Sequence, residues 1–144
     1  MPDAVTPGLE RFVAAQAPVY AAVLRELGAG RKTSHWMWFV FPQLRSLGRS
    51  ATAMFYGLEG RKEASAYWQH PLLGARLGEC TRLVLGSAGR SAHEIFGSPD
   101  DLKLRSCMTL FDVVAPAEPA FRAVLDRFYG GQADPMTLAE VDRR

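Results

Sequence analysis

The sequence predicts an all-α protein: a single compact domain of seven to nine short helices. Its 20 Ala and 16 Leu far outnumber its 10 Val, 6 Thr and 1 Ile, and Ala and Leu favour helices whereas β-branched residues favour strands. Helix start and stop signals also recur along the chain, with apolar residues at helical spacing between them. A length of 144 residues with 48% hydrophobic content fits one domain with its own core. We therefore expect 1–144 to form one domain, with residues 1–8 as a flexible N-terminal lead.

The first two helices are predicted at 9–16 and 18–27. Pro18 forces the break between them, because proline suits the first turn of a helix but not its interior. Apolar residues in the second segment recur at spacings of three and four, and Gly28 then stops the helix.

A run of aromatic and apolar residues at 35–41 is harder to assign. Seven such residues would also suit a buried strand, but no other segment has the pattern of a partner strand. Ser34 can cap a helix here, and Pro42 disfavours helix at the residue before it. We therefore predict two turns of buried helix.

The second half of the chain carries the clearest helix signals. An amphipathic helix is predicted at 71–88, and Ser91 begins a capping box that opens the next one. Ser98 is followed by a proline and two aspartates, which together mark another N-terminus. Apolar spacing over 121–128 predicts a further helix that a Gly pair ends, and Asp134 with the next proline opens a short terminal one.

Charge and composition exclude several function classes. The chain has 17 basic and 15 acidic residues, a net charge of +2 and no basic run, which argues against a dedicated nucleic-acid surface. No apolar run approaches the roughly 18 residues of a membrane helix, and the N-terminus lacks a signal-peptide pattern. We expect a cytoplasmic protein with no membrane contact and no cofactor, in which Cys80 and Cys107 are buried, reduced thiols. We also expect no metal site, because the histidines are isolated. The oligomeric state stays open.

Residues 28–35 form a glycine-containing turn rich in cationic and hydroxyl side chains. The segment does not fit a P-loop, which needs glycines at two positions where this chain has Glu26 and Arg31. The turn nevertheless leads Lys32 to a predicted helix N-terminus, where free N–H groups and the helix dipole attract anions. Lys32 and Ser34 are therefore candidates for holding a phosphate or carboxylate. The alternative is a solvated turn in which Ser34 is only a cap.

Several aromatic and titratable side chains are candidates for a site. Trp36 and Trp38 would point about 200° apart on a helix, so one of them is a candidate for lining a cleft and stacking on a planar ligand. Lys103 borders the apolar arc of its helix, and it either snorkels past the core edge or points into a pocket. His35 and His70 are acid–base candidates, and both have a structural alternative because each lies at a predicted helix start.

Three long motifs then stand out: GRKTSHWMWFVFPQ at 30–43 followed by LGRS at 47–50, AYWQHPLLGARL at 66–77, and FGSPDDLKLRSCMTLF at 96–111. They resemble the bacterial family catalogued as domain of unknown function 1810, some of whose members carry the name calpastatin. The resemblance runs from about Leu9 to the C-terminus and implies a mainly helical fold without an established activity. Cys107 stands where the family tends to have a second serine, so a ligand contact made by that hydroxyl would be lost. Calpain inhibition fits poorly, because calpastatin's inhibitory segments are disordered and this chain is apolar.

A shorter motif, Phe12-x-x-Ala15-Gln16, is similar to one in small α-helical proteins that process ADP-ribose derivatives. Together with the cationic turn beside tryptophans, it favours a phosphorylated, base-bearing ligand. We hypothesise a pocket for an anionic, nucleotide-like small molecule and, if the chain is an enzyme, hydrolysis of an N-glycosidic bond of an ADP-ribose-type compound. The candidates are His35, His70 and Lys103 for acid–base chemistry, and Lys32, Ser34, Trp36, Trp38, Gln43, Ser50, Arg76 and Ser106 for ligand binding. The alternative hypothesis is a non-enzymatic interaction module that presents an aromatic patch to a partner protein.

Overall fold

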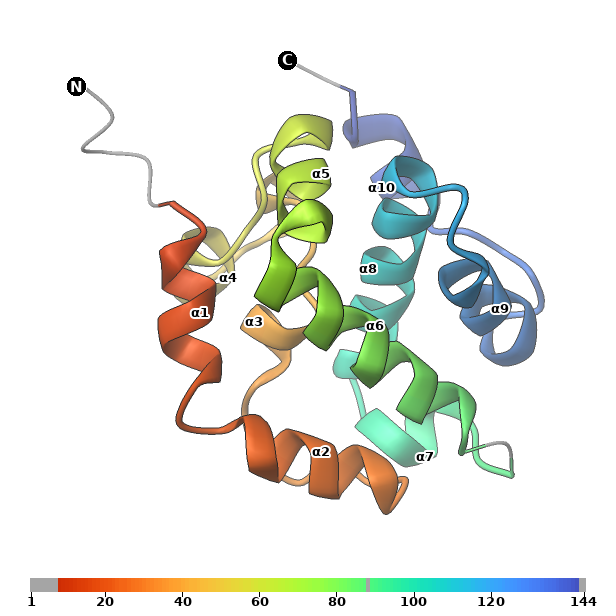
Figure 1. Cartoon of the computed structure of the whole chain (residues 1–144). Coiled ribbons are helices and arrows are strands. Elements are labelled where there is room, and N and C mark those ends of the chain that lie inside the picture. Colours follow the sequence, from red (N-terminus) through yellow and green to blue (C-terminus); the bar gives the residue numbers. More distant parts are fainter. Residues whose placement is uncertain (1–7, 88, 143–144) are drawn as a thin grey trace.

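Helices make up the regular secondary structure of the computed structural model, which describes residues 8–87 and 89–142 (Figure 1). The elements are α1 (Glu10–Gln16), α2 (Tyr20–Gly28), α3 (Met37–Val40), the 3-10 helix η2 (Arg45–Leu47), α4 (Ala51–Phe55), α5 (Arg61–Gln69), α6 (Pro71–Leu85), α7 (Ala92–Phe96), α8 (Asp100–Val114), α9 (Pro119–Phe128) and α10 (Pro135–Glu140). Within these ranges there is no strand, and one isolated bridge pairs Leu44 with Leu58. The predicted lead, residues 1–8, lies outside the described residues except for Gly8.

The all-α class is confirmed, but the expected seven to nine helices are too few, since the described residues contain ten α-helices. Two of them, α4 and α5, had no predicted counterpart. α4 has only five residues, so it is too short for an apolar spacing to repeat. α5 begins with three charged residues and buries only Ala64 and Tyr67. Periodicity detects a helix only where an apolar face repeats, which explains both omissions.

The aromatic run forms less helix than predicted. α3 covers only four residues, and Trp36 takes its N-cap position without a side-chain hydrogen bond. Ser34 was expected to cap this helix, but its hydroxyl donates to Glu26 Oε2 at 2.6 Å instead. The run supplies core residues as expected: Met37, Val40 and Phe41 are all buried.

Most other predicted helix ends are confirmed. Ser91 and Glu94 form the capping box of α7, and the carboxylate of Asp134 accepts from the Thr137 N–H at the start of α10. α6 ends at Leu85, three residues before the predicted end. At α8 the N-cap position falls on Pro99 rather than on Ser98, while the two aspartates occupy the first turn as predicted, where the helix dipole favours negative charge.

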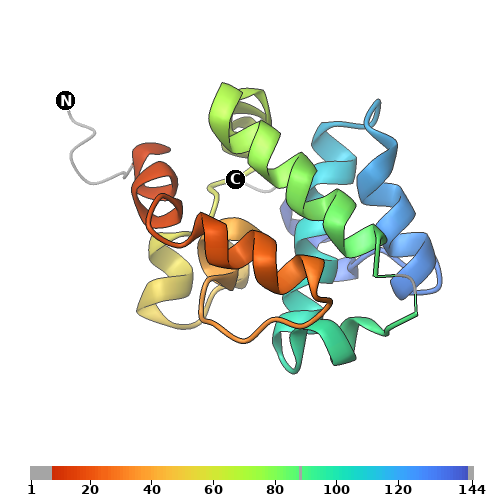
Figure 2. The ribbon, with the colours of Figure 1, turned by 60° about the horizontal axis from the view of Figure 1, so that its bottom comes forward.

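The central helices are α6 and α8 (Figures 1 and 2). α6 packs against α2, α5 and α9, and α8 packs against α5, α7, α9 and α10. A chain of aromatic rings crosses the core from α1 to α9. Its centroid distances are 5.0 Å from Phe12 to Tyr67, 5.6 Å from Tyr67 to Phe111 and 5.8 Å from Phe111 to Phe121. These rings join the N-terminal and C-terminal helices in one hydrophobic core.

Both cysteines are buried, free thiols, as the sequence predicts. Burial raises the pKa of Cys80 to about 12, and it raises the pKa of Cys107 well above the ordinary value. Both thiols are therefore protonated at neutral pH, and they react with external reagents only when the surrounding structure opens.

Candidate functional site

The turn after α2 folds back along that helix (Figure 2). Two of its backbone N–H groups donate to the carboxylate of Glu26. This side chain is only 7% exposed. Its Oε1 accepts hydrogen bonds from the backbone N–H groups of Thr33 (2.8 Å) and Ser34 (3.0 Å) and from the indole N–H of Trp36 (2.9 Å). The turn that was predicted to bind an anion thus binds a carboxylate of the protein itself.

These hydrogen bonds keep Glu26 ionised. Burial raises the pKa of its carboxyl, but the bonds from Ser34, Thr33 and Trp36 outweigh burial and lower the pKa from 4.5 to about 2. The hydroxyl of Ser34 and the indole N–H of Trp36 are therefore already engaged. Since Trp36 is also 0% exposed, a ligand cannot stack on it in this conformation.

A second carboxylate, Asp100 at the start of α8, joins the two candidate lysines. The Nζ of Lys32 lies 2.9 Å from Oδ2 of Asp100, and the Nζ of Lys103 lies 3.8 Å from Oδ1. Each ammonium group also sits over an indole: Lys32 is 5.1 Å from the Trp36 ring centroid and Lys103 is 5.2 Å from that of Trp38. The Lys32 side chain is 7% exposed and that of Lys103 is 26% exposed. Lys103 is thus the more accessible cation.

Three predicted ligand-binding or catalytic residues, Trp38, Gln43 and Lys103, line one small cavity, here called the Trp38 cavity. Its other lining residues are Met37, Phe41, Ala53 and Tyr56. The cavity volume is about 10 Å³, which is room for about one water molecule. α3, the loop after it, α4 and α8 meet here. The tryptophans therefore separate as their positions predicted, with Trp36 in the core and Trp38 half-buried beside the cavity.

Three other candidates stabilise helix ends. The Nδ1 of His70 accepts from the backbone N–H groups of two leucines, at 3.1 and 3.2 Å, and so caps α6. Ser50 caps α4, because its Oγ accepts from the Ala53 N–H at 3.1 Å. Ser106 donates to Oδ2 of Asp134 at 3.1 Å and so helps to hold the N-cap of α10.

The remaining candidates lie outside the lining of the Trp38 cavity. Arg76 donates to Oε1 of Gln16 at 3.3 Å, and its guanidinium lies 4.6 Å from the Tyr20 ring centroid. His35 is exposed in the turn before α3. Cys107 is 0% exposed, so a serine hydroxyl in its place would face the core and not a ligand.

Sequence reasoning missed Glu26 and Asp100 as organisers of the site. Glu26 carried a usable signal: it follows Val23 by three residues, so an acid lies on the apolar face of α2. Buried carboxylates require several hydrogen-bond donors, and the neighbouring turn offers them. Asp100 was interpreted only as a partner of the helix dipole, and nothing in its spacing indicated a contact with Lys32.

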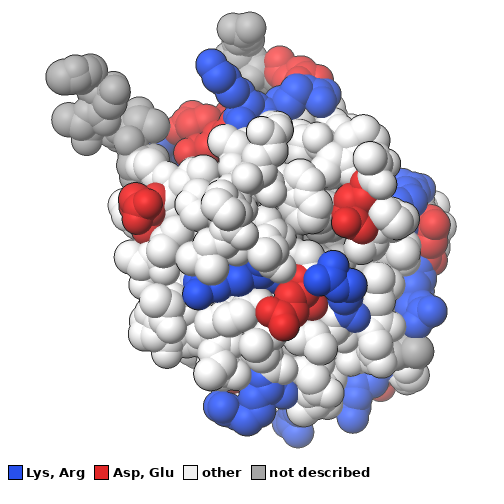
Figure 3. All heavy atoms as spheres, in the orientation of Figure 1, with Lys and Arg blue, Asp and Glu red and all other residues white. Residues whose placement is uncertain are grey.

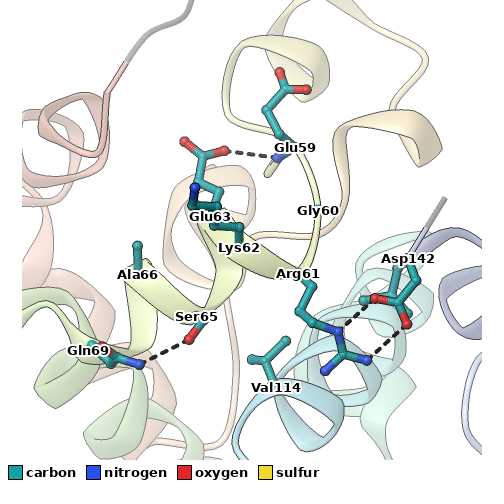
Figure 4. A pocket seen from close by; sticks show the side chains of 11 residues that line it. Glu59, Gly60, Arg61, Lys62, Glu63, Ser65, Ala66, Gln69, Val114 and Asp142 are labelled. Carbon is teal, nitrogen blue, oxygen red and sulfur yellow. Dashed lines mark hydrogen bonds and ion pairs between the residues drawn. The ribbon is translucent and has the colours of Figure 1, made fainter. Parts of the chain in front are cut away.

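A larger hollow of about 830 Å³ lies beside the first turns of α5 (Figure 4). Arg61 extends across it to Asp142, with N–O distances of 2.7 and 3.0 Å, and its hydrogen bonds lower the pKa of Asp142. Both side chains are substantially exposed, at 48% and 63%. None of the candidate residues lines this hollow.

The face shown in Figure 3 carries charges of both signs around a largely uncharged area over α5, and Lys and Arg predominate along the edge over α2. In the described part of the chain, no helix is long and apolar enough to cross a membrane. Nor do three His, Cys, Asp or Glu side chains come together there in a group that could hold a metal ion.

Comparison with known proteins places this geometry in context. A profile of the family described as "Protein of unknown function (DUF1810)" matches residues 6–141. The chain is also similar to the conserved hypothetical protein Rv1873 from Mycobacterium tuberculosis, known from a crystal structure. The two are 57% identical, with a TM-score of 0.92, over 94% of this chain and 97% of that one. A search of the curated proteins found no match.

Proposed function

The chain belongs to the DUF1810 family, whose description assigns no activity, and we propose a function from the site itself: the Trp38 cavity binds an anionic, nucleotide-like small molecule. The observation that carries this proposal is the meeting of Trp38, Gln43 and Lys103 at one cavity. Their residue types match the parts of a nucleotide. An indole stacks on a planar base, an ammonium group pairs with phosphate, and an amide both donates to and accepts from a base or ribose.

The charges around Asp100 support an anionic ligand. Two ammonium groups share this one carboxylate, so the cluster carries one positive charge in excess. Lys32 makes the short contact and is nearly buried, whereas Lys103 makes the long contact at 3.8 Å and is partly exposed. An incoming phosphate therefore meets Lys103 first, while Asp100 helps to hold that lysine in place.

The finer form of the proposal is hydrolysis of an N-glycosidic bond in an ADP-ribose-type compound. Water adds across the bond: the C–N bond breaks, a hydroxyl goes to the anomeric carbon and a proton goes to the leaving nitrogen. The step needs a proton donor close to that nitrogen. Of the three acid–base candidates, Lys103 is the one that lines the Trp38 cavity, whereas Nδ1 of His70 is engaged by two backbone N–H groups.

The alternative function, an interaction module with an aromatic patch, has narrower support. Within the run 35–41, His35 is exposed, Trp38 and Phe39 are half-buried and the other four residues are buried, so the run itself does not present an aromatic patch. The observation in its favour is on α4, where Met54 is 42% and Phe55 is 47% exposed. A partner that binds there would lose affinity in Phe55→Ala and not in Lys103→Met.

We predict that ADP-ribose stabilises the protein against heat, and that Lys103→Met weakens its binding by about tenfold or more, because a charge-assisted hydrogen bond is lost. Thermal-shift and calorimetric titration measure both, with adenosine as the ligand that lacks the phosphates. Trp38 fluorescence, isolated by comparison with Trp38→Phe, reports stacking.

Lys62→Met is the matched control, because Lys62 is exposed on α5 and lines the larger hollow instead. An unchanged affinity in Lys103→Met together with a weakened affinity in Lys62→Met would place the ligand in that hollow and contradict the proposal.

For the hydrolytic form, the measurement is release of the free base from an N-glycosidic ADP-ribose compound. Binding without release leaves a binding protein and rejects the hydrolase.

A further inference from the structure

The Trp38 cavity is far smaller than the ligand it is proposed to hold. Its volume is about 10 Å³, whereas small-molecule sites usually measure about 300–1,000 Å³. A nucleotide-like ligand can enter only if one wall of the cavity moves. Two of the walls belong to the core, because Met37 and Phe41 are 1% exposed, and the third is Lys103 on the long helix α8.

The fourth wall, α4, is weakly packed. None of its residues is buried, and its main partner is the short helix η2. It contributes Ala53, and the following Tyr56, to the cavity lining. A segment with little buried apolar surface opens at a low free-energy cost compared with the core helices, so α4 is the wall that moves most easily.

The two ends of α4 are held very differently. At the C-terminal end, Arg11 of α1 donates to the carbonyl oxygens of Phe55 (2.7 Å) and Gly57 (2.9 Å). Tyr56 packs there against the rings of Phe12 and Phe39, at centroid distances of 5.8 and 5.2 Å. At the N-terminal end, the Oγ of Ser50 accepts from the Ala53 N–H, and Ala53 lies close to Gly48. The C-terminal end is therefore anchored by more side-chain contacts than the N-terminal end, so the first turn is the part that unwinds most easily.

We propose that α4 is a lid on the Trp38 cavity, which opens by unwinding of its first turn while the anchor at Arg11 and Tyr56 stays in place. The proposal rests on the proposed function for what enters the cavity. The opening itself takes place without ligand and is measured without one.

Thiol labelling measures the opening directly. Met37→Cys puts a thiol on the cavity wall beneath α4, where the native residue is 1% exposed, and Cys80 and Cys107 are buried references in the same molecule. With excess N-ethylmaleimide and mass-spectrometric mapping, we expect the new thiol to react at least about tenfold faster than both references, since local opening is more frequent than global unfolding.

Two substitutions at the N-terminal end of α4 act in opposite directions. Ser50→Ala removes the cap and should raise the labelling rate of the new thiol, relative to that of the buried reference thiols, about fivefold. Ala51→Pro should lower the ratio about two- to fivefold, because proline at the first helical position restricts the unwound chain. The site accepts proline: Ala51 is exposed, and Ser50 before it already has the extended backbone, φ −92° and ψ 164°, that proline requires of its predecessor. Ala75→Cys, on the exposed face of α6, should label equally fast in all backgrounds.

Hydrogen exchange of the otherwise unmodified protein gives a second measurement that does not depend on a core substitution. We expect the amides of residues 53–56 to exchange faster than those of α8, and faster still in Ser50→Ala. Equal labelling of the new and native thiols, or a ratio that neither substitution changes, would overturn the lid. A lid that opens in a protein that binds no ADP-ribose rejects only the proposed function, and binding without any opening rejects only the lid.

Discussion

At the scale of single residues, Glu26 is a buried charge that the fold stabilises. Four donors from Thr33, Ser34 and Trp36 bind its carboxylate, and its pKa falls from 4.5 to about 2. A shift of this size corresponds to about 3 kcal/mol in favour of the folded state. Because the folded pKa is depressed, this stabilisation is fully present above about pH 4.5 and is lost as the pH falls towards 2.

We predict that Glu26→Gln lowers the free energy of unfolding by about 2–3 kcal/mol at pH 7, and that the difference from wild type narrows as the pH falls below 4.5. Urea denaturation at neutral and acidic pH measures both effects. Glu10→Gln is the control, because Glu10 is exposed on α1 and its replacement should change stability by less than about 0.5 kcal/mol. A difference that stays constant with pH would show that the charge of Glu26 is not what the turn stabilises.

At the scale of elements, α5 and α6 approach each other too closely at Gly74 to admit a side chain. A Cβ added there would lie 2.0 Å from the carbonyl oxygen of Trp68. One turn later on the same helix, a Cβ on Gly78 would lie 3.2 Å from the guanidinium end of Arg82, which is flexible and can move aside. The two glycines of α6 therefore differ in what their neighbours tolerate, although both would favour Ala on helix propensity alone.

We predict that Gly74→Ala lowers the free energy of unfolding by about 3 kcal/mol, because the helices must separate. Gly78→Ala should be neutral or stabilise the protein by up to about 1 kcal/mol. Urea or thermal denaturation followed by circular dichroism compares the two variants. Equal losses in both would mean that the close approach of α5 and α6 is not the cause.

At the scale of the whole molecule, the aromatic chain from Phe12 through Tyr67 and Phe111 to Phe121 joins helices from both ends of the sequence. We predict one cooperative unfolding transition, with far-UV circular dichroism and tryptophan fluorescence coinciding. Phe111→Ala, at a site that is 0% exposed, should cost about 3–5 kcal/mol. The control Phe55→Ala, at a site that is 47% exposed, should cost less than about 1 kcal/mol. Two separate transitions would contradict the single domain that the sequence predicts.

The sequence by itself determined the all-α class, the buried thiols and most helix starts, such as the capping box at Ser91 and the cap at Asp134. These features depend on composition and on residues three or four apart, which act within one helical turn. It also separated Trp36 from Trp38 and singled out Lys103, because a helix places residues at known angles around its axis.

Only the tertiary structure decided the partners of those side chains. Ser34 was predicted to cap a helix and instead donates to Glu26, and Lys32 was expected to meet a ligand and instead meets Asp100. α4 is too short, and α5 has too few buried positions, for apolar spacing to indicate either helix, yet α4 forms one wall of the Trp38 cavity. The physical reason is the same in each case. A donor pairs with whichever acceptor the packing of distant helices brings within about 3 Å, and local sequence spacing does not encode that distance.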